Sequence, residues 1–227
     1  MIKKYTSLLF DIDNTLLDFF AAEKSAVSYV LKAEGLPFDD ETVSFYSAIN
    51  QSYWERFERG EIPKSDIFEG RFKTLLSEIK REGDPAKISK EYCARLSCEH
   101  QKVDGADEIL ICLKERGYKL YAATNGLSST QYRRIEESGL KKYFDGIFVS
   151  EDAGHQKPEK EYYDYVISKI EEKDRRKMLI IGDSMSSDIL GGKNAEIDTC
   201  WFNFAGTKKL YEPDYQINSL AELKNIL

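Results

Sequence analysis

Beyond about residue 103, short apolar runs alternate with stretches whose apolar residues recur every three or four positions. Runs of about four to eight apolar residues are typical of buried strands, and the wider spacing is typical of amphipathic helices. The expected strands are Ser7–Phe10, Lys119–Ala123, Gly146–Val149, Met178–Ile181, Thr199–Phe202 and Tyr215–Ile217, and the expected helices are Ala106–Arg116, Ser129–Ser138, Lys160–Ile170, Met185–Ala195 and a terminal one. Repeated strand–helix units predict an α/β fold with a parallel sheet and helices on both of its faces.

The segment from about Phe19 to His100 interrupts this alternation, because it carries helical stripes and almost no strand-like pattern. Helices are expected at Ala22–Ala33, from Asp39 or Asp40 to near Gly60, after Pro63 and Ser65, and after Pro85. Aspartate commonly caps a helix N-terminus, and proline is tolerated in the first helical turn. The pattern therefore predicts an all-helical domain, residues 18–100, inserted into an α/β domain that comprises residues 1–17 and 101–227.

The composition describes an acidic chain that can bury a sizeable core: 227 residues, 41% hydrophobic and 32% charged, with a net charge of −7. Its basic residues are spread out and outnumbered, which argues against a nucleic-acid polymer as partner. No apolar segment approaches the length of a membrane span or of a signal peptide. The four cysteines lack CxxC spacing, so a structural zinc site is not expected. We expect a cytoplasmic protein without membrane contact, monomeric or homodimeric.

Most of the charged and hydroxylic candidates lie just after the expected strands, and one, Lys157, lies between two of them. The carboxyl ends of parallel strands open into the ligand crevice of an α/β sheet, so these side chains are expected to meet there. They are Asp11, Asp13, Thr124, Asn125, Lys157, Asp183 and Asp188. Asp11 and Asp13 would be costly to bury unpaired, and a cation between them or a proton on one would remove most of that cost. Converging carboxylates favour Mg²⁺, and a lysine beside a threonine hydroxyl suits a phosphoryl group.

Taken singly, some of these residues have simpler explanations. Thr124 could simply end a strand, Lys157 could be a solvated surface lysine, and Asp188 could be a favourable charge near a helix N-terminus. The aspartates that come directly after buried strands are harder to explain in this way. His155, two residues before Lys157, is expected to be a loop residue and not a catalytic one.

The set as a whole resembles the four-motif signature of the haloacid-dehalogenase-like hydrolases. The motifs are Asp11-Ile12-Asp13-Asn14-Thr15, Thr124-Asn125, Lys157-Pro158, and Gly182-Asp183 followed by Asp188. The resemblance runs from Leu8 to about Phe202 and keeps the order of motifs in that family. It implies a Rossmann-like α/β core, with the helical segment in the place where the family inserts its helical cap.

The resemblance also implies roles for the aspartates. Asp11 would be the nucleophile that forms an aspartyl-phosphate, and Asp13 would protonate the leaving oxygen and later take a proton from water. Mg²⁺ would be held by Asp11, the main-chain carbonyl of Asp13, and Asp183. Asp188 would position a metal-bound water or pair with Lys157.

The phosphoryl group would lie against the second and third motifs. Thr124, with main-chain N–H groups around Asn125 and Gly126, would cradle its oxygens, and Lys157 would neutralise charge on the nucleophile and the phosphate. Asp13 indicates the class of reaction, since relatives that break carbon–halogen bonds generally lack a carboxylate there. The resemblance therefore implies a phosphatase that hydrolyses small phosphomonoesters.

The segment Phe10–Glu23, in which Asn14 stands where many relatives have glycine, most resembles the pyrimidine 5′-nucleotidase branch. The implied substrate is a (deoxy)pyrimidine nucleoside monophosphate. The N-acylneuraminate 9-phosphatase branch shares this asparagine and is the alternative. Phe19 and Phe20, where the helical segment begins, are candidates for contacting a nucleobase. A receiver-type signalling domain is disfavoured, because such domains are about half as long and lack the inserted helices.

Overall fold

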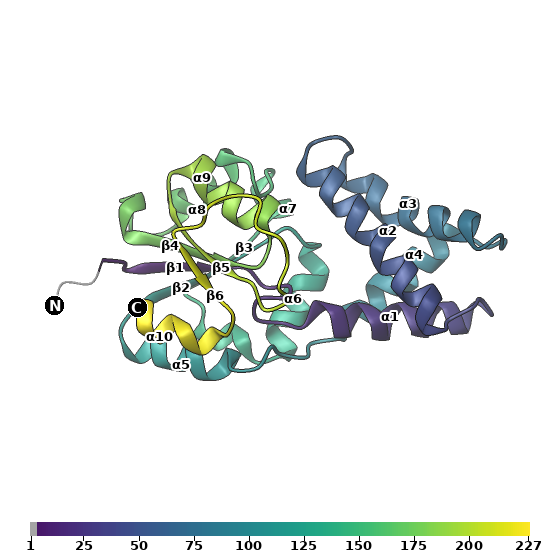
Figure 1. Cartoon of the computed structure of the whole chain (residues 1–227), viewed down its shortest axis with the longest axis horizontal. Coiled ribbons are helices and arrows are strands. Elements are labelled where there is room, and N and C mark those ends of the chain that lie inside the picture. The colour runs from purple at the N-terminus through teal and green to yellow at the C-terminus, as the bar shows by residue number, and fades with distance from the viewer. Residues whose placement is uncertain (1–3) are drawn as a thin grey trace. The chain divides into compact units, whose positions relative to one another are not determined.

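The computed structural model describes residues 4–227, which divide into two compact units (Figure 1). One unit contains the chain up to Asp18 together with Gln101–Leu227, and the other is Phe19–His100. Each unit has a hydrophobic core of its own. Among residues 4–227, no helix combines the length and the apolar character that a membrane crossing requires.

Within the described residues, the first unit contains a six-stranded sheet in the order β3-β2-β1-β4-β5-β6, and all neighbouring strands are parallel. The strands are β1 (Ser7–Phe10), β2 (Lys119–Thr124), β3 (Gly146–Val149), β4 (Met178–Gly182), β5 (Asp198–Phe202) and β6 (Tyr215–Ile217). β1 lies in the middle of the sheet, where Phe10 is level with Ala122 of β2 and Ile181 of β4. The predicted parallel sheet is confirmed, with strand ends that differ from the expected ones by at most one residue.

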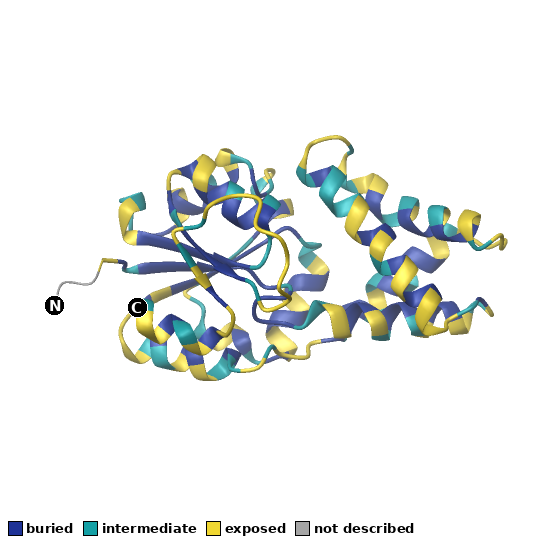
Figure 2. Ribbon diagram, in the orientation of Figure 1, coloured by how far each residue is buried: buried dark blue, intermediate teal, exposed yellow. Residues whose placement is uncertain are grey.

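Helices cover both faces of this sheet, as predicted. They are α5 (Ala106–Glu115), α6 (Ser128–Glu137), α7 (Ser150–Ala153), α8 (Lys160–Lys169), α9 (Leu190–Ala195) and α10 (Leu223–Ile226), with short 3₁₀ turns at Leu140–Tyr143, Arg175–Lys177 and Leu220–Glu222. Because side chains alternate along a strand, Leu8 and Phe10 pack in one core cluster with Leu113 of α5, and Leu9 packs in another with Val166 of α8. The central strands β1 and β4 are accordingly buried along their whole length (Figure 2).

One predicted helix is divided in the structure. Met185–Ala195 was expected to be continuous, but Met185–Ile189 forms a π turn and the α-helix begins at Leu190. The N–H of Ile189 donates to the Ser184 carbonyl at 3.1 Å, which is the i→i+5 bond that defines this wider turn. Such single turns are frequent at functional sites.

The second unit contains four helices: α1 (Phe19–Ala33), α2 (Asp40–Glu58), α3 (Lys64–Glu78) and α4 (Pro85–Leu96). Asp39 caps α2 by accepting the N–H of Thr42 at 2.9 Å, in line with the expected cap. Helix α1 begins at Phe19 and not at Ala22, because the apolar face continues back to Phe19, which packs against the core of this unit. The fold-class prediction of an α/β core with an inserted all-helical segment is confirmed.

Candidate active site

The three central strands deliver the motif residues to one edge of the sheet. Asp11 continues directly from β1, and its N–H donates to the carbonyl of Ile181 in β4 at 2.8 Å. Thr124 ends β2, and Asp183 follows β4. These strands are parallel and in register, so their carboxyl ends lie side by side, which is where ligands bind in open α/β sheets.

Lys157 links the residues from these strands to the turn after β4. Its side chain is 2% exposed, and its Nζ donates to Asp11 Oδ1 at 2.6 Å and to Asp188 Oδ1 at 2.7 Å. It also donates to the carbonyl of Ala123 at 2.9 Å. All three ammonium hydrogens therefore have acceptors. Burial alone would lower the pKa of Lys157, but the Asp11 and Asp188 carboxylates outweigh it and hold that pKa well above its usual value.

The carboxylates around Lys157 outnumber it. Asp11, Asp183 and Asp188 each offer a ligand oxygen, and these oxygens lie within 4.8 Å of one another. Burial, together with the charges of Asp188 and Asp13, raises the pKa of Asp11 to about 7 despite the opposing effect of Lys157. Burial and the charges of Asp11 and Asp188 raise the pKa of Asp183 well above its usual value. Negative charge in this cluster is therefore only partly compensated by the chain itself.

The excess of negative charge in this cluster fits a divalent cation. Carboxylate oxygens are the ligands that Mg²⁺ prefers, and a cation beside them would lower their pKa values. Asp11 and Asp183 are the two carboxylates predicted to hold Mg²⁺. Asp188 was predicted to pair with Lys157 or a metal-bound water, and it pairs with Lys157, while its Oδ2 accepts the N–H of Ser184 at 3.1 Å.

The carboxylate of Asp13 has partners that the sequence did not indicate. Arg134 of α6 forms an ion pair with Asp13 Oδ1, and Gln131 of the same helix donates through Nε2 to Asp13 Oδ2 at 3.0 Å. Gln131 Nε2 also donates to Thr124 Oγ1 at 2.7 Å. One helix therefore contacts both the predicted acid–base residue and the predicted phosphate-binding hydroxyl.

The loop after β2 is fixed by Asn125 and Gly126. The Asn125 side chain accepts the N–H of Lys157 at 2.9 Å and donates to the Lys157 carbonyl at 2.8 Å, so it joins the second and third motifs. The Gly126 N–H donates to Thr124 Oγ1 at 3.3 Å. The Thr124 hydroxyl oxygen accepts hydrogen bonds from Gly126 and Gln131. Its hydroxyl hydrogen therefore remains to be donated, as binding of a phosphoryl oxygen requires.

Gly182 and Trp201 support the aspartates after β4. A Cβ at Gly182 would collide with the Asp188 carboxylate, so only glycine leaves room for this close approach. The buried Trp201 of β5 donates through Nε1 to the carbonyl of Asp183 at 2.8 Å. The sequence pattern around Trp201 did not indicate this contact, since a tryptophan in an apolar strand is typical of core packing.

Comparison with known proteins identifies the family of this chain. A family model described as haloacid dehalogenase-like hydrolase matches residues 8–202. The chain belongs to this family. The pyrimidine 5′-nucleotidase PynA of Streptococcus pneumoniae is 38% identical to this chain, and the match covers 98% of this chain and 97% of PynA. The pyrimidine 5′-nucleotidase YjjG of Escherichia coli is 31% identical over 99% of this chain and 98% of that protein.

A crystal structure extends this likeness to the fold. The HAD-hydrolase YfnB of Bacillus subtilis, solved bound to magnesium, is 41% identical to the hydrolase with a TM-score of 0.94, and the match covers 99% of each chain. The predicted family and the prediction of a phosphomonoester hydrolase are confirmed.

The structure explains the asparagine that the hydrolase carries in its first motif. Asn14 has a φ of 58°, in the left-handed region that glycine adopts freely and that asparagine tolerates better than most residues. The turn that contains it is closed by the Asn14 N–H, which donates to the Leu17 carbonyl at 2.7 Å. Glycine and asparagine are therefore the residues that fit this turn best, which accounts for the interchange noted from the sequence.

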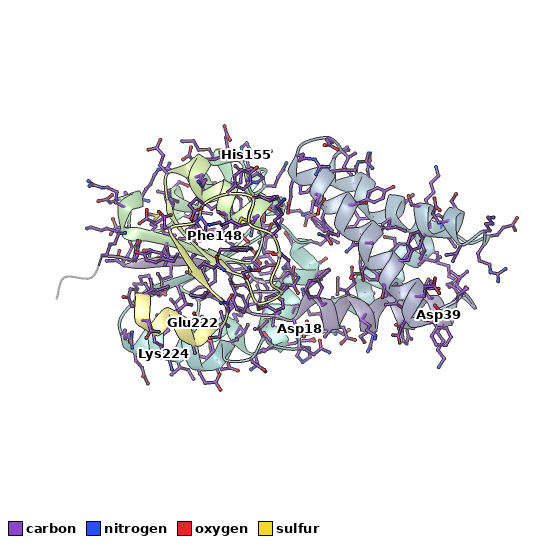
Figure 3. The ribbon with its side chains drawn as sticks, in the orientation of Figure 1. Asp18, Asp39, Phe148, His155, Glu222 and Lys224 are labelled. Carbon is purple, nitrogen blue, oxygen red and sulfur yellow. The ribbon has the colours of Figure 1, made fainter. Side chains whose placement is uncertain are left out.

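Three further residues discussed from the sequence, Phe19, Phe20 and His155, lie outside the aspartate cluster. Phe19 packs against the core of the helical unit, and Phe20 is 53% exposed. Their role in substrate specificity stays a prediction. His155 lies in an exposed loop of the α/β unit (Figure 3), 3.4 Å from the carboxylate of Glu159. The hydrolase thus keeps His155 on its surface, where a loop residue was expected.

Proposed function

We propose that this hydrolase is a Mg²⁺-dependent 5′-nucleotidase that removes phosphate from (deoxy)pyrimidine nucleoside monophosphates. The observation that carries the proposal is the buried Lys157 bridging Asp11 and Asp188, with Asp183 beside them. An aspartate that directly follows a central strand, next to a buried lysine and excess carboxylate, suits attack on a phosphate held by a cation. The full-length likeness to two pyrimidine 5′-nucleotidases supports the choice of substrate.

In this proposal the reaction has two steps. A carboxylate oxygen of Asp11 attacks phosphorus, the bond from phosphorus to the leaving oxygen breaks, and Asp13 gives its proton to that oxygen. Water then attacks phosphorus in the aspartyl-phosphate and gives a proton to Asp13. The bond from phosphorus to Asp11 breaks and its electron pair returns to the carboxylate. Asp13 therefore begins the next turnover protonated.

Other residues of the chain hold the phosphate. The Thr124 hydroxyl and main-chain N–H groups near Gly126 would bind its non-bridging oxygens. Lys157 would offset negative charge on Asp11 and on the phosphate. Asp11, Asp183 and the main-chain carbonyl of Asp13 would hold Mg²⁺, which when bound supplies positive charge that reduces the repulsion between nucleophile and phosphate.

A phosphate-release screen with Mg²⁺ tests the substrate. The panel contains dUMP, dTMP, UMP and CMP, the purine nucleotides AMP and GMP, and N-acylneuraminate 9-phosphate as the alternative substrate. We expect kcat/KM for the pyrimidine nucleotides to exceed that for the others by about tenfold or more, since one well-placed contact is worth about 1.4 kcal/mol or more. A preference for the sugar-acid phosphate would reject the nucleotidase assignment and leave the phosphatase class in place.

A further inference from the structure

Buried side chains of helix α6 contact the Asp13 carboxylate. The Asp13 side chain is 28% exposed, whereas the Arg134 side chain paired with it is 1% exposed, and Gln131 is also buried. Each Asp13 oxygen accepts a hydrogen bond from one of these two residues. A carboxylate held at both oxygens from within the fold keeps one orientation, and its exposed part remains open to a reacting group.

The two helix residues also fix one another. Gln131 and Arg134 are three positions apart, so they lie on the same face of α6. Arg134 Nη1 donates to Gln131 Oε1 at 3.2 Å, which directs the amide nitrogen of Gln131 toward Asp13 and Thr124. A Cβ at Gly126 would lie 2.5 Å from Gln131 Cγ, so the glycine leaves the room that this side chain occupies.

We propose that Arg134 and Gln131 are positioning residues, which set the geometry between the acid–base carboxylate of Asp13 and the phosphate-binding hydroxyl of Thr124. This inference rests on the proposed function, because it assumes that Asp13 transfers the proton. Proton transfer requires the acid within hydrogen-bond reach of the leaving oxygen, and a displacement of about 1 Å can cost about 10²-fold in rate. Arg134 and Gln131 touch neither substrate nor nucleophile in this scheme and act only through their partners.

Steady-state kinetics on dUMP and on phenyl phosphate test this role. Arg134→Met is expected to lower kcat by about 10²-fold with KM changed less than about twofold, since alignment and not binding is lost. Arg134→Lys, which keeps a cation, is expected to recover part of the loss. Gln131→Met is expected to lower kcat by about tenfold. The matched control is Arg133→Met, because Arg133 lies on the same helix but is solvent-exposed and pairs with Glu137.

A double-mutant cycle with Asp13→Asn separates positioning from a structural effect. If Arg134 acts through Asp13, adding Arg134→Met to Asp13→Asn changes kcat less than about twofold, whereas additive losses would overturn the inference. Circular dichroism and melting temperature are recorded for every variant. Should Arg134→Met not fold, Gln131→Met is added instead to the double variant Asp13→Asn/Thr124→Val, since Gln131 donates to both residues, and additivity there overturns the inference equally.

The outcomes distinguish this inference from the proposed function. Wild-type turnover that is lost in Asp11→Asn, combined with additive cycles, rejects the positioning role and leaves the phosphatase mechanism intact. If the wild-type protein releases no phosphate from any substrate of the panel, the proposed function fails, and the positioning role fails with it.

Discussion

Both units of the chain bury charged side chains, but they balance them differently. In the α/β unit, three carboxylates of Asp11, Asp183 and Asp188 meet one lysine, Lys157. In the helical unit, Glu23 accepts hydrogen bonds from Ser47 and Asn50, and Asn50 in turn accepts from Arg71 at 2.8 Å. The helical cluster thus contains one carboxylate and one guanidinium, joined through an amide.

The difference supports the proposal that the cluster in the α/β unit is the reaction site. A buried cluster whose charges cancel within the chain is complete, and its contribution is to packing and to the specificity of the fold. The Arg71 guanidinium, 4.5 Å from the ring centroid of Tyr92, belongs to such a packed arrangement. A cluster with uncompensated carboxylates needs a partner from solution, which is what a metal and a phosphate ester provide.

The largest expected effect is that of Asp11→Asn. Removing the proposed nucleophile is expected to lower phosphate release on the order of 10⁵-fold, as for enzymes that use a covalent nucleophile. The melting temperature, measured in chelator, should stay close to that of the wild-type protein, since a buried and partly compensated charge is replaced by an amide of the same shape. Substantial residual turnover would remove Asp11 from the nucleophile role.

Chelation is the next largest perturbation. EDTA is expected to lower activity by about 10²-fold or more and added Mg²⁺ to restore it, because the proposed cation would contribute several kcal/mol to charge stabilisation. Mg²⁺ should also raise the melting temperature of the wild-type protein, and this shift should be smaller in Asp183→Asn. Full activity in chelator, or an equal shift in both proteins, would contradict the metal assignment.

Disrupting the helical cluster of Glu23, Asn50 and Arg71 is expected to lower the stability of the protein. Arg71→Met leaves the Glu23 carboxylate buried without its cation, which should lower the free energy of unfolding by about 3–5 kcal/mol. Urea unfolding followed by circular dichroism measures this change. The control is Arg81→Met, because Arg81 is exposed in the same unit and its replacement should change stability by less than about 0.5 kcal/mol. Equal effects of the two variants would mean that the cluster contributes nothing.

The smallest expected effect is a pH dependence of the folding stability, caused by Glu23 of the same cluster. Burial raises the pKa of Glu23 above its usual value, against the opposing hydrogen bonds from Ser47 and Asn50. Since this pKa is higher in the folded chain, the stabilisation is present below the ordinary glutamate pKa and is lost as pH rises through the raised one. The stability of Glu23→Gln relative to wild type should therefore increase as pH rises above the ordinary glutamate pKa of 4.5. Glu82→Gln, at an exposed position, is the control and should show no such trend.

The sequence predicted the strands and the motif residues because both are local features. A buried strand is recognised from its own apolar run, and Asp11 and Asp183 are located by following such runs. Their convergence followed from a general property of parallel sheets and not from any pairwise signal. The π turn at Met185–Ile189 could not be predicted in this way, since an i→i+5 turn leaves no periodicity of its own.

Gln131 and Arg134 were missed for a different physical reason. Polar residues on an amphipathic helix are usually solvated, and Arg133, their neighbour, is exposed as expected. A weak signal was nevertheless present. Helix α6 has ten residues, of which only Tyr132 and Ile135 are large and apolar, so its inward face has to include polar side chains. Those side chains need buried partners, and the motif carboxylates and hydroxyls are the groups that provide them.

The central place of β1 constrains the order in which the protein can fold during synthesis. Its two neighbours, β2 and β4, come from the chain after residue 100, so the whole helical unit leaves the ribosome before β1 can pair. The helical unit has a core of its own, and it can therefore fold first. Until β2 emerges, the apolar residues Leu8–Phe10 lack their sheet partners, and apolar segments that are exposed in this way promote aggregation.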